Sequence, residues 1–216
     1  MVTDATTLNY NSAAYHEAGH LTAAVVLAMP LQQRGLYIDM EGNGISYYWM
    51  RDPGDMANNS PKDQRERQLS LVTLYAGGIA QRAFFPDCPN TGWKRDEEKI
   101  EQLLREIHPA SEVDRSVASA DLRTRAETLV SKYYPFISGL AEELLSRACK
   151  VLPPSETNSM PPWTTGTLGR SMTGDEVIEF FKKSIPEASA RVFVWAGKNY
   201  DPSADKPLYD CIALNT

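Results

Sequence analysis

The chain of 216 residues is 42% hydrophobic and 23% charged, with a formal net charge of −6 at pH 7, so it can bury a sizeable core and is expected to form one domain with appendages. No cluster of lysine and arginine is long enough to follow a phosphate backbone, which argues against nucleic acid as a partner. No apolar run approaches the length of a membrane span, and the first residues do not resemble a secretory signal. The three cysteines are widely spaced without a C-x-x-C pair, as expected for reduced thiols in a cytoplasmic protein.

The amino-terminal quarter predicts a buried helix followed by a β-hairpin. Residues 12–29 are expected to be helical, with Pro30 ending the helix. Their apolar positions recur at helical spacing, which places one face of the helix in the core. These positions are Ala14, Ala18, Leu21, Val25 and Ala28. Residues 35–40 and 45–50 are rich in Tyr, Ile and Trp and are joined by the turn residues 41–44, a pattern typical of a hairpin.

A second long helix is expected to begin at Ser60-Pro61, where a capping serine precedes a proline in the first turn, and to run to Phe84 or Phe85. The pair Gly77-Gly78 inside this helix costs about 1 kcal/mol per glycine relative to alanine. The pair either permits close approach of another helix or marks a local break, and the sequence leaves both alternatives open.

The rest of the chain predicts further helices and one long loop. The expected helices cover residues 92–108, 116–134 and 136–151, the last two separated at Pro135. Residues 152–172 are rich in Pro, Ser, Thr and Gly and are expected to form a loop. A capping box at residues 173–176 opens a last helix that ends near Ser184, and residues 191–196 form one strand-like run.

Residues 16–20 read His-Glu-Ala-Gly-His, a pattern that indicates a metal site. Residues four apart lie on one face of a helix, so His16 and His20 can point at the same ion. Glu17 lies a quarter-turn away and can reach a metal-bound water without being a ligand. This arrangement is typical of zinc hydrolases, in which the carboxylate takes the proton of that water.

A catalytic zinc needs a third protein ligand and leaves its fourth position for water. The nearby choices are Asp96, Glu97, Glu98 and His108. The residues four, seven and eleven positions after Asp96 are the apolar stripe of their helix: Ile100, Leu103 and Ile107. A carboxylate on that stripe is costly to bury unless it binds something positive, which favours Asp96, whereas His108 is expected to cap the helix end. The alternative that Asp96 only favours the helix dipole stays open.

Four stretches of the chain resemble the FtsH-type peptidase domain, the zinc protease part of membrane-anchored AAA proteases. The run Ala14–His20 is similar to its A-Y-H-E-A-G-H signature, and Leu74–Ala80 to its L-Y-G-G-R-x-A helix. The run Thr91–Asp96 has the spacing of its T-G-A-x-N-D segment, and residues 167–177 resemble its T-L-x-G-x-E-V close. The resemblance covers about residues 10–184.

The resemblance implies a mainly α-helical, zincin-like fold with a small β-hairpin or sheet beside the active site. It implies one zinc ion per chain, with His16, His20 and Asp96 as ligands and Glu17 as general base. The sequence departs from the family in having no Walker A glycine loop and no transmembrane helix. It also has Ala80-Gln81-Arg82 where the family has A-E-E, so a carboxylate supporting the ligands is replaced.

We therefore expect residues 1–184 to form a stand-alone peptidase domain, followed by an extension of unknown role at 185–216. Its expected function is zinc-dependent, ATP-independent hydrolysis of peptides or unfolded proteins. One hairpin strand is expected to align an extended substrate or else to be ordinary sheet, and its residues are Gly44, Ile45, Ser46 and Tyr47. The alternative function is a non-catalytic zinc-binding interaction module, or a component recruited by a separate ATPase or regulatory partner.

Overall fold

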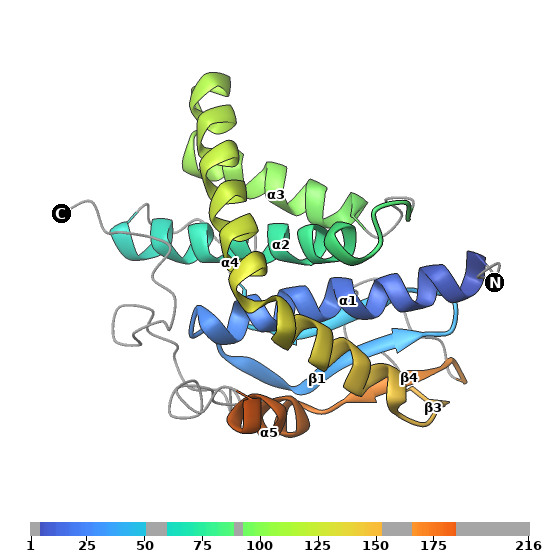
Figure 1. Ribbon diagram of the computed structural model, residues 1–216. Helices are drawn as coiled ribbons and strands as arrows, with labels where there is room; N and C mark the ends of the chain where they lie inside the picture. Colours follow the sequence, from blue (N-terminus) through green and yellow to red (C-terminus); the bar gives the residue numbers. More distant parts are fainter. Residues whose placement is uncertain (1–4, 51–59, 89–92, 153–165, 185–216) are drawn as a thin grey trace.

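The computed structural model describes residues 5–50, 60–88, 93–152 and 166–184, and this part of the chain is mainly helical with one small antiparallel sheet (Figure 1). Its helices are α1 (Ala5–Val26), α2 (Pro61–Phe84), α3 (Lys94–Ile107), α4 (Glu112–Ser146) and α5 (Gly174–Ser184). Its strands are β1 (Leu31–Asp39), β2 (Gly44–Tyr48), β3 (Lys150–Val151) and β4 (Leu168–Met172). The expected fold class, mainly α with a small sheet, is confirmed. The predicted run at 191–196 and the extension from 185 onward lie outside the described residues.

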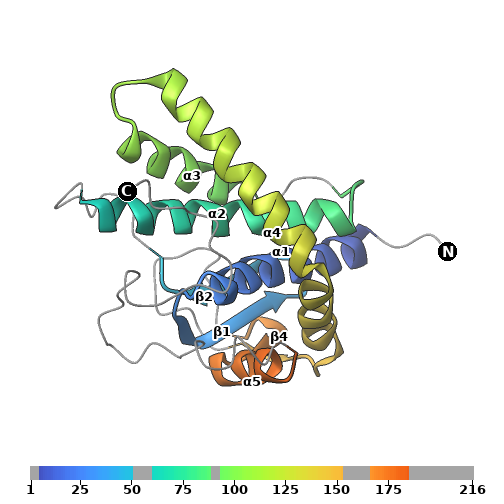
Figure 2. The same ribbon diagram turned by 60° about the vertical axis from the view of Figure 1, so that its left-hand side comes forward.

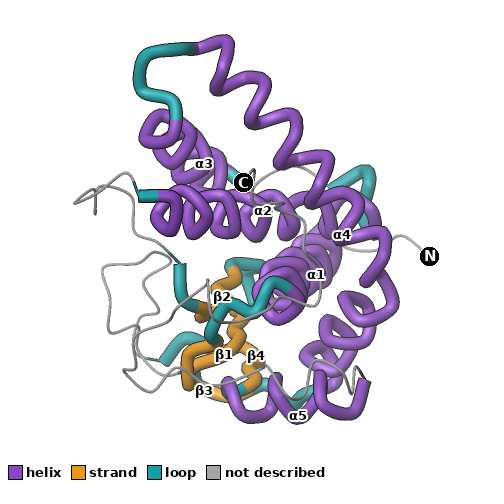
Figure 3. Tube along the Cα trace, turned by 90° about the vertical axis from the view of Figure 1, so that its left-hand side faces the viewer, coloured by secondary structure: helices purple, strands orange, loops and turns teal. Residues whose placement is uncertain are grey.

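The elements are layered around α1. Helix α2 lies along one side of α1 and the sheet along the other, while α4 packs against both helices (Figures 1 and 2). Helix α5 packs against β1 on the side away from α2 (Figure 3). This layering places one face of α1 against α2 and another against the strands, so its side chains can meet residues from both.

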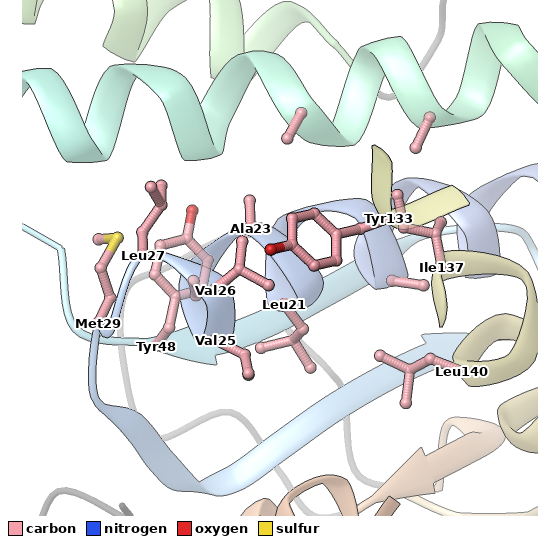
Figure 4. Packing of buried hydrophobic residues seen from close by; sticks show 14 of the residues in the cluster. Leu21, Ala23, Val25, Val26, Leu27, Met29, Tyr48, Tyr133, Ile137 and Leu140 are labelled. Atoms are coloured by element: carbon pink, nitrogen blue, oxygen red, sulfur yellow. The ribbon is translucent and has the colours of Figure 1, made fainter. Parts of the chain in front are cut away.

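Helix α1 is the centre of the hydrophobic core. Every residue from Ala23 to Met29 is at most 3% exposed, and residues of β2 and α4 pack around this end of the helix (Figure 4). A helix that is apolar on all sides is stable only when enclosed, and the predicted burial is confirmed. The helix begins earlier than expected and ends at Val26, ahead of Ala28, which has a positive φ of 59°.

The predicted start of α2 is confirmed in detail. The Ser60 hydroxyl accepts a hydrogen bond from the backbone N–H of Asp63, and the Asp63 carboxylate accepts one from the backbone N–H of Ser60. These two bonds form a capping box, which satisfies backbone donors that a helix start leaves free. The helix runs unbroken through Gly77-Gly78, so the alternative of a local break at this pair is excluded.

The sheet has the strand order β2-β1-β4-β3, and all its neighbours are antiparallel. The predicted hairpin is confirmed as β1 and β2, although β1 begins at Leu31, earlier than expected. Strand β4 corrects the predicted loop at 152–172, because residues 168–172 form a strand that pairs with β1 and β3. Gly169 fits this pairing because a Cβ there would lie 2.2 Å from the carbonyl oxygen of Ile38.

Helix α4 comprises the predicted pair of helices, joined across a kink near Pro135. The non-helical residue is Tyr133 (φ −104°, ψ 16°), slightly before the proline at which the separation was expected. Proline lacks the N–H that continues the helical hydrogen bonds, and its ring pushes the preceding turn aside, so the helix bends at this point. The helix also ends at Ser146, which leaves residues 150–151, expected to be helical, free to form β3.

The last predicted helix is confirmed as α5, and its capping box joins Thr173 and Glu176 through reciprocal hydrogen bonds. Cys88 and Cys149 are both free thiols; Cys88 is buried and Cys149 is exposed. Among the described residues, no helix combines the length and the hydropathy required of a membrane span.

Candidate metal centre

Three donor atoms from two helices converge on one point. The Nε2 atoms of His16 and His20, on α1, lie 2.9 Å apart, and each lies 3.0 Å from Oδ2 of Asp96, in the first turn of α3. Both histidines are buried, whereas the Asp96 side chain keeps 18% exposure. The three residues predicted from spacing and helical face are therefore brought together.

The acidic neighbours of Asp96 are turned away from this point. Glu97 and Glu98 are exposed, whereas Leu103 on the Asp96 face is fully buried. His108 is the C-cap residue of α3, as expected, and it does not belong to the cluster that brings the two α1 histidines and Asp96 together. The prediction that Asp96 lies on the inward face of this helix, with Glu97 and Glu98 turned away, is confirmed.

Gln81 of α2 fixes which nitrogen of His16 carries the proton. The indole Nε1–H of Trp93 only donates, so the Gln81 atom 2.7 Å from it is the amide oxygen. That oxygen also lies 3.1 Å from Nδ1 of His16 and must accept a hydrogen bond from it, while the amide nitrogen donates to Ser12. The proton of a neutral His16 is therefore on Nδ1, and its Nε2 presents a lone pair to the cluster.

A backbone carbonyl of α2 determines which ring nitrogen of His20 carries the proton. Its Nδ1 lies 2.8 Å from the carbonyl oxygen of Thr73, which can only accept, so Nδ1 carries a proton and Nε2 faces His16 and Asp96. Three electron-rich atoms about 3 Å apart repel one another unless a positive charge lies among them. That charge is either a proton on one imidazole or a metal ion.

Without a metal ion, Asp96 favours the protonated form of His20. Burial alone would lower the pKa of His20, but the charge and the hydrogen bond of Asp96 outweigh it and raise the pKa to about 9. Burial would likewise raise the pKa of Asp96, yet the facing His20 and the hydrogen bonds from both imidazoles hold it well below its usual range. The cluster is thus built to hold positive charge.

The donor set fits zinc. Two imidazole nitrogens and one carboxylate oxygen are ligands that zinc takes in catalytic sites. Two ligands of a tetrahedral zinc lie about 3.3 Å apart, slightly more than the separations of the three donors here. The hydrogen bonds to Gln81 and Thr73 are of the kind that orients histidine ligands.

Glycines allow α2 to approach α1 at this centre. A Cβ on Gly77 would lie 2.4 Å from Nε2 of His20, and one on Gly78 would lie 2.7 Å from the ring of Trp93. On the facing helix, a Cβ on Gly19 would lie 2.7 Å from the carbonyl oxygen of Ala76. Of the two readings of Gly77-Gly78 left open by the sequence, close approach is correct.

Glu17 is buried, at 6% exposure, and lies beside the edge strand. A Cβ on Gly44, the first residue of β2, would lie 2.6 Å from Oε1 of Glu17. Ile45 and Tyr47 instead pack in a second small core with Tyr37. Of the residues predicted to bind substrate, Gly44 is thus at the carboxylate, whereas Ile45 and Tyr47 point to the other side of the sheet.

Three groups beside the centre were not found from the sequence: the Trp93 indole, the Thr73 carbonyl and the Tyr48 ring. A lone tryptophan or backbone carbonyl leaves no periodic signal, because its role depends on which helices meet. The Tyr48 ring lies 6.3 Å from the His20 ring, centroid to centroid. Burial, and then the charges of Asp96 and Glu17, raise the pKa of Tyr48 well above its usual value.

No model of a known protein family matches the chain, and no curated protein sequence matches it. Functional inference therefore depends on the chemistry of the centre itself.

Proposed function

We propose that this protein is a zinc-dependent metalloendopeptidase with a zincin-like, FtsH-type active site, which hydrolyses peptides or unfolded proteins in the cytoplasm. The observation that carries the proposal is the convergence of His16 Nε2, His20 Nε2 and Asp96 Oδ2, with Glu17 adjacent in the same helix. His16, His20 and Asp96 would hold one zinc ion per chain.

When bound, zinc makes water acidic enough to act as a nucleophile at neutral pH and polarises a carbonyl group. Glu17 serves as general base, taking the proton of the attacking water and delivering it to the leaving amide nitrogen. A glutamate beside the first histidine has no use in a purely structural zinc site, which is closed by four protein ligands. The presence of Glu17 therefore favours a catalytic over a structural zinc site.

Strand β2 is suited to align the substrate. Among the described strands, it is the outer strand of the sheet and β1 is its one partner, so an extended peptide can add to it through backbone hydrogen bonds. Gly44 begins this strand against the Glu17 carboxylate, which would bring a backbone held by β2 next to the general base.

The burial of the cluster favours a second candidate. His16, Glu17 and His20 are each less than 10% exposed, which also suits a zinc-stabilised interaction module without catalysis, or a component recruited by a separate ATPase or regulatory partner. The two functions differ in one respect: only the peptidase has a role for the Glu17 carboxylate.

The test combines metal analysis with hydrolysis. Purified protein is assayed for zinc and then incubated with a quenched fluorogenic peptide library and with unfolded casein, without nucleotide. We expect about one zinc per chain and cleavage that a chelator abolishes and added zinc restores. Stoichiometric zinc without hydrolysis would support the interaction module, and a chain that binds no zinc would contradict both functions.

A further inference from the structure

Tyr48 presents a phenol to the metal centre from the end of β2. Neighbouring residues of a strand point to opposite faces, and Tyr47 packs against Tyr37 on the far face. Tyr48 therefore faces α1, where its ring lies beside His20. In Figure 4 the hydroxyl end of Tyr48 points toward α2, the helix that carries the supports of both histidines.

The phenol oxygen makes no hydrogen bond to any residue in the described part of the chain, and it is not one of the fully enclosed polar atoms there. A phenylalanine would fill the same space as the tyrosine ring. The charges of Asp96 and Glu17 both act on this phenol. The Tyr48 ring thus lies beside the centre, and packing alone does not explain its hydroxyl.

Among the described residues, the two ligand histidines, Asp96 and Glu17 direct no hydrogen-bond donor toward a substrate carbonyl at the proposed zinc-bound centre, and Tyr48 can supply one. Asp96 and Glu17 are carboxylates, which only accept, and both imidazoles turn their lone pairs toward the cluster. When water adds to a peptide carbonyl, negative charge builds on the carbonyl oxygen and must be stabilised. A phenol is neutral at pH 7 and can donate to that oxygen.

We propose that Tyr48 is a catalytic residue, the hydrogen-bond donor to the scissile carbonyl oxygen as its charge develops. The inference deepens the proposed peptidase function and depends on it. No covalent bond to Tyr48 forms, and its proton stays on the phenol oxygen throughout. Because the interaction strengthens only as charge develops, its loss should appear in kcat rather than in KM.

The test compares Tyr48→Phe with Tyr37→Phe. Tyr37 is a matched control: it is also buried, lies on the adjacent strand β1, and belongs to the second small core away from the metal centre. For each variant, zinc content, melting temperature, kcat and KM on a fluorogenic peptide are measured, together with inhibition by a phosphinic peptide, whose tetrahedral anion imitates the charged intermediate.

We expect Tyr48→Phe to keep its zinc, melting temperature and KM, to lose about 10²–10³-fold in kcat, and to bind the phosphinic peptide more weakly by a similar factor. Tyr37→Phe should match the unsubstituted protein in all five measurements. An active protein whose Tyr48→Phe variant has unchanged kcat and inhibition would overturn the role of Tyr48 alone. Absence of hydrolysis by the zinc-loaded unsubstituted protein would instead overturn the peptidase function, and this role with it.

Discussion

Gly77 and His20 occupy adjoining space so closely that a side chain on one would displace the other: a Cβ on Gly77 would lie 2.4 Å from both Cε1 and Nε2 of the imidazole. A glycine inside a helix costs stability, and α2 has two in succession. The close approach they permit brings the Thr73 carbonyl and Gln81 of α2 within hydrogen-bonding distance of the two histidines.

Gly77→Ala should therefore push the His20 ring out of the cluster. We expect zinc affinity to fall at least about 100-fold, because losing a group that only orients a ligand already costs up to about that factor. Zinc affinity is measured by competition with a chelator. Gly139→Ala is the control, because this glycine is also inside a helix and its added Cβ would meet only the ring end of Phe180, at 3.2 Å. Equal zinc affinity of Gly77→Ala and the unsubstituted protein would show that His20 is not a ligand.

The acidic run at the start of α3 permits a sharper comparison. Asp96→Asn should reduce zinc affinity by at least about 100-fold, because the neutral amide loses the charge that faces both imidazoles. Glu97→Gln and Glu98→Gln should leave the affinity unchanged, since both side chains are exposed. If either of these two controls loses zinc while Asp96→Asn keeps it, the proposed ligand set is wrong.

Gln81 is expected to be the chief support of His16. Gln81→Leu removes the acceptor shared by His16 and Trp93, so zinc affinity should fall about 10–100-fold. The indole N–H of Trp93 would then be buried without an acceptor, which should lower the free energy of unfolding by about 1–3 kcal/mol. Gln81→Glu retains an acceptor for both donors and should bind zinc with nearly unchanged affinity. Zinc affinity and urea unfolding measured on both variants check this, and an unaffected Gln81→Leu would refute the role.

The metal-free protein should become less stable as the pH rises from about 6.5 to 9. The folded-state pKa of His20 is raised to about 9 from a usual 6.5, so its stabilising ion pair with Asp96 is fully present below pH 6.5 and is lost as His20 deprotonates. Urea unfolding of chelator-treated protein across this range measures the effect. Asp96→Asn should abolish most of the pH dependence, and an unchanged slope in that variant would contradict the ion pair.

The sequence predicts elements well where the signal is local. Ser60 and Thr173 cap their helices through residues three positions on, so both starts were predictable. Strand β4 was not predictable, because residues 168–172 follow a polar, proline-rich stretch and become a strand only by pairing with β1 and β3. The separation within α4 was predictable from Pro135, whereas its exact place at Tyr133 depends on the local bend.

The difference between local and long-range signals also applies to the candidate metal centre. His16, His20 and Asp96 were predictable because helical spacing determines which face each residue occupies. Gln81 stood out only as a departure from a family motif, and its contact with Trp93 depends on the packing of α2 against the start of α3. Residues that orient ligands across helices cannot be found by periodicity along one of them.

Glu17→Gln tests the central claim most directly. Glutamine keeps the size of the side chain, so the variant should fold and bind zinc as the unsubstituted protein does, but it cannot accept the proton of the attacking water. Cleavage of the fluorogenic peptide is compared for the two proteins at equal zinc occupancy. A loss of about 10²–10⁴-fold in kcat is the result expected of a general base, whereas equal rates for the two proteins would contradict the proposed mechanism.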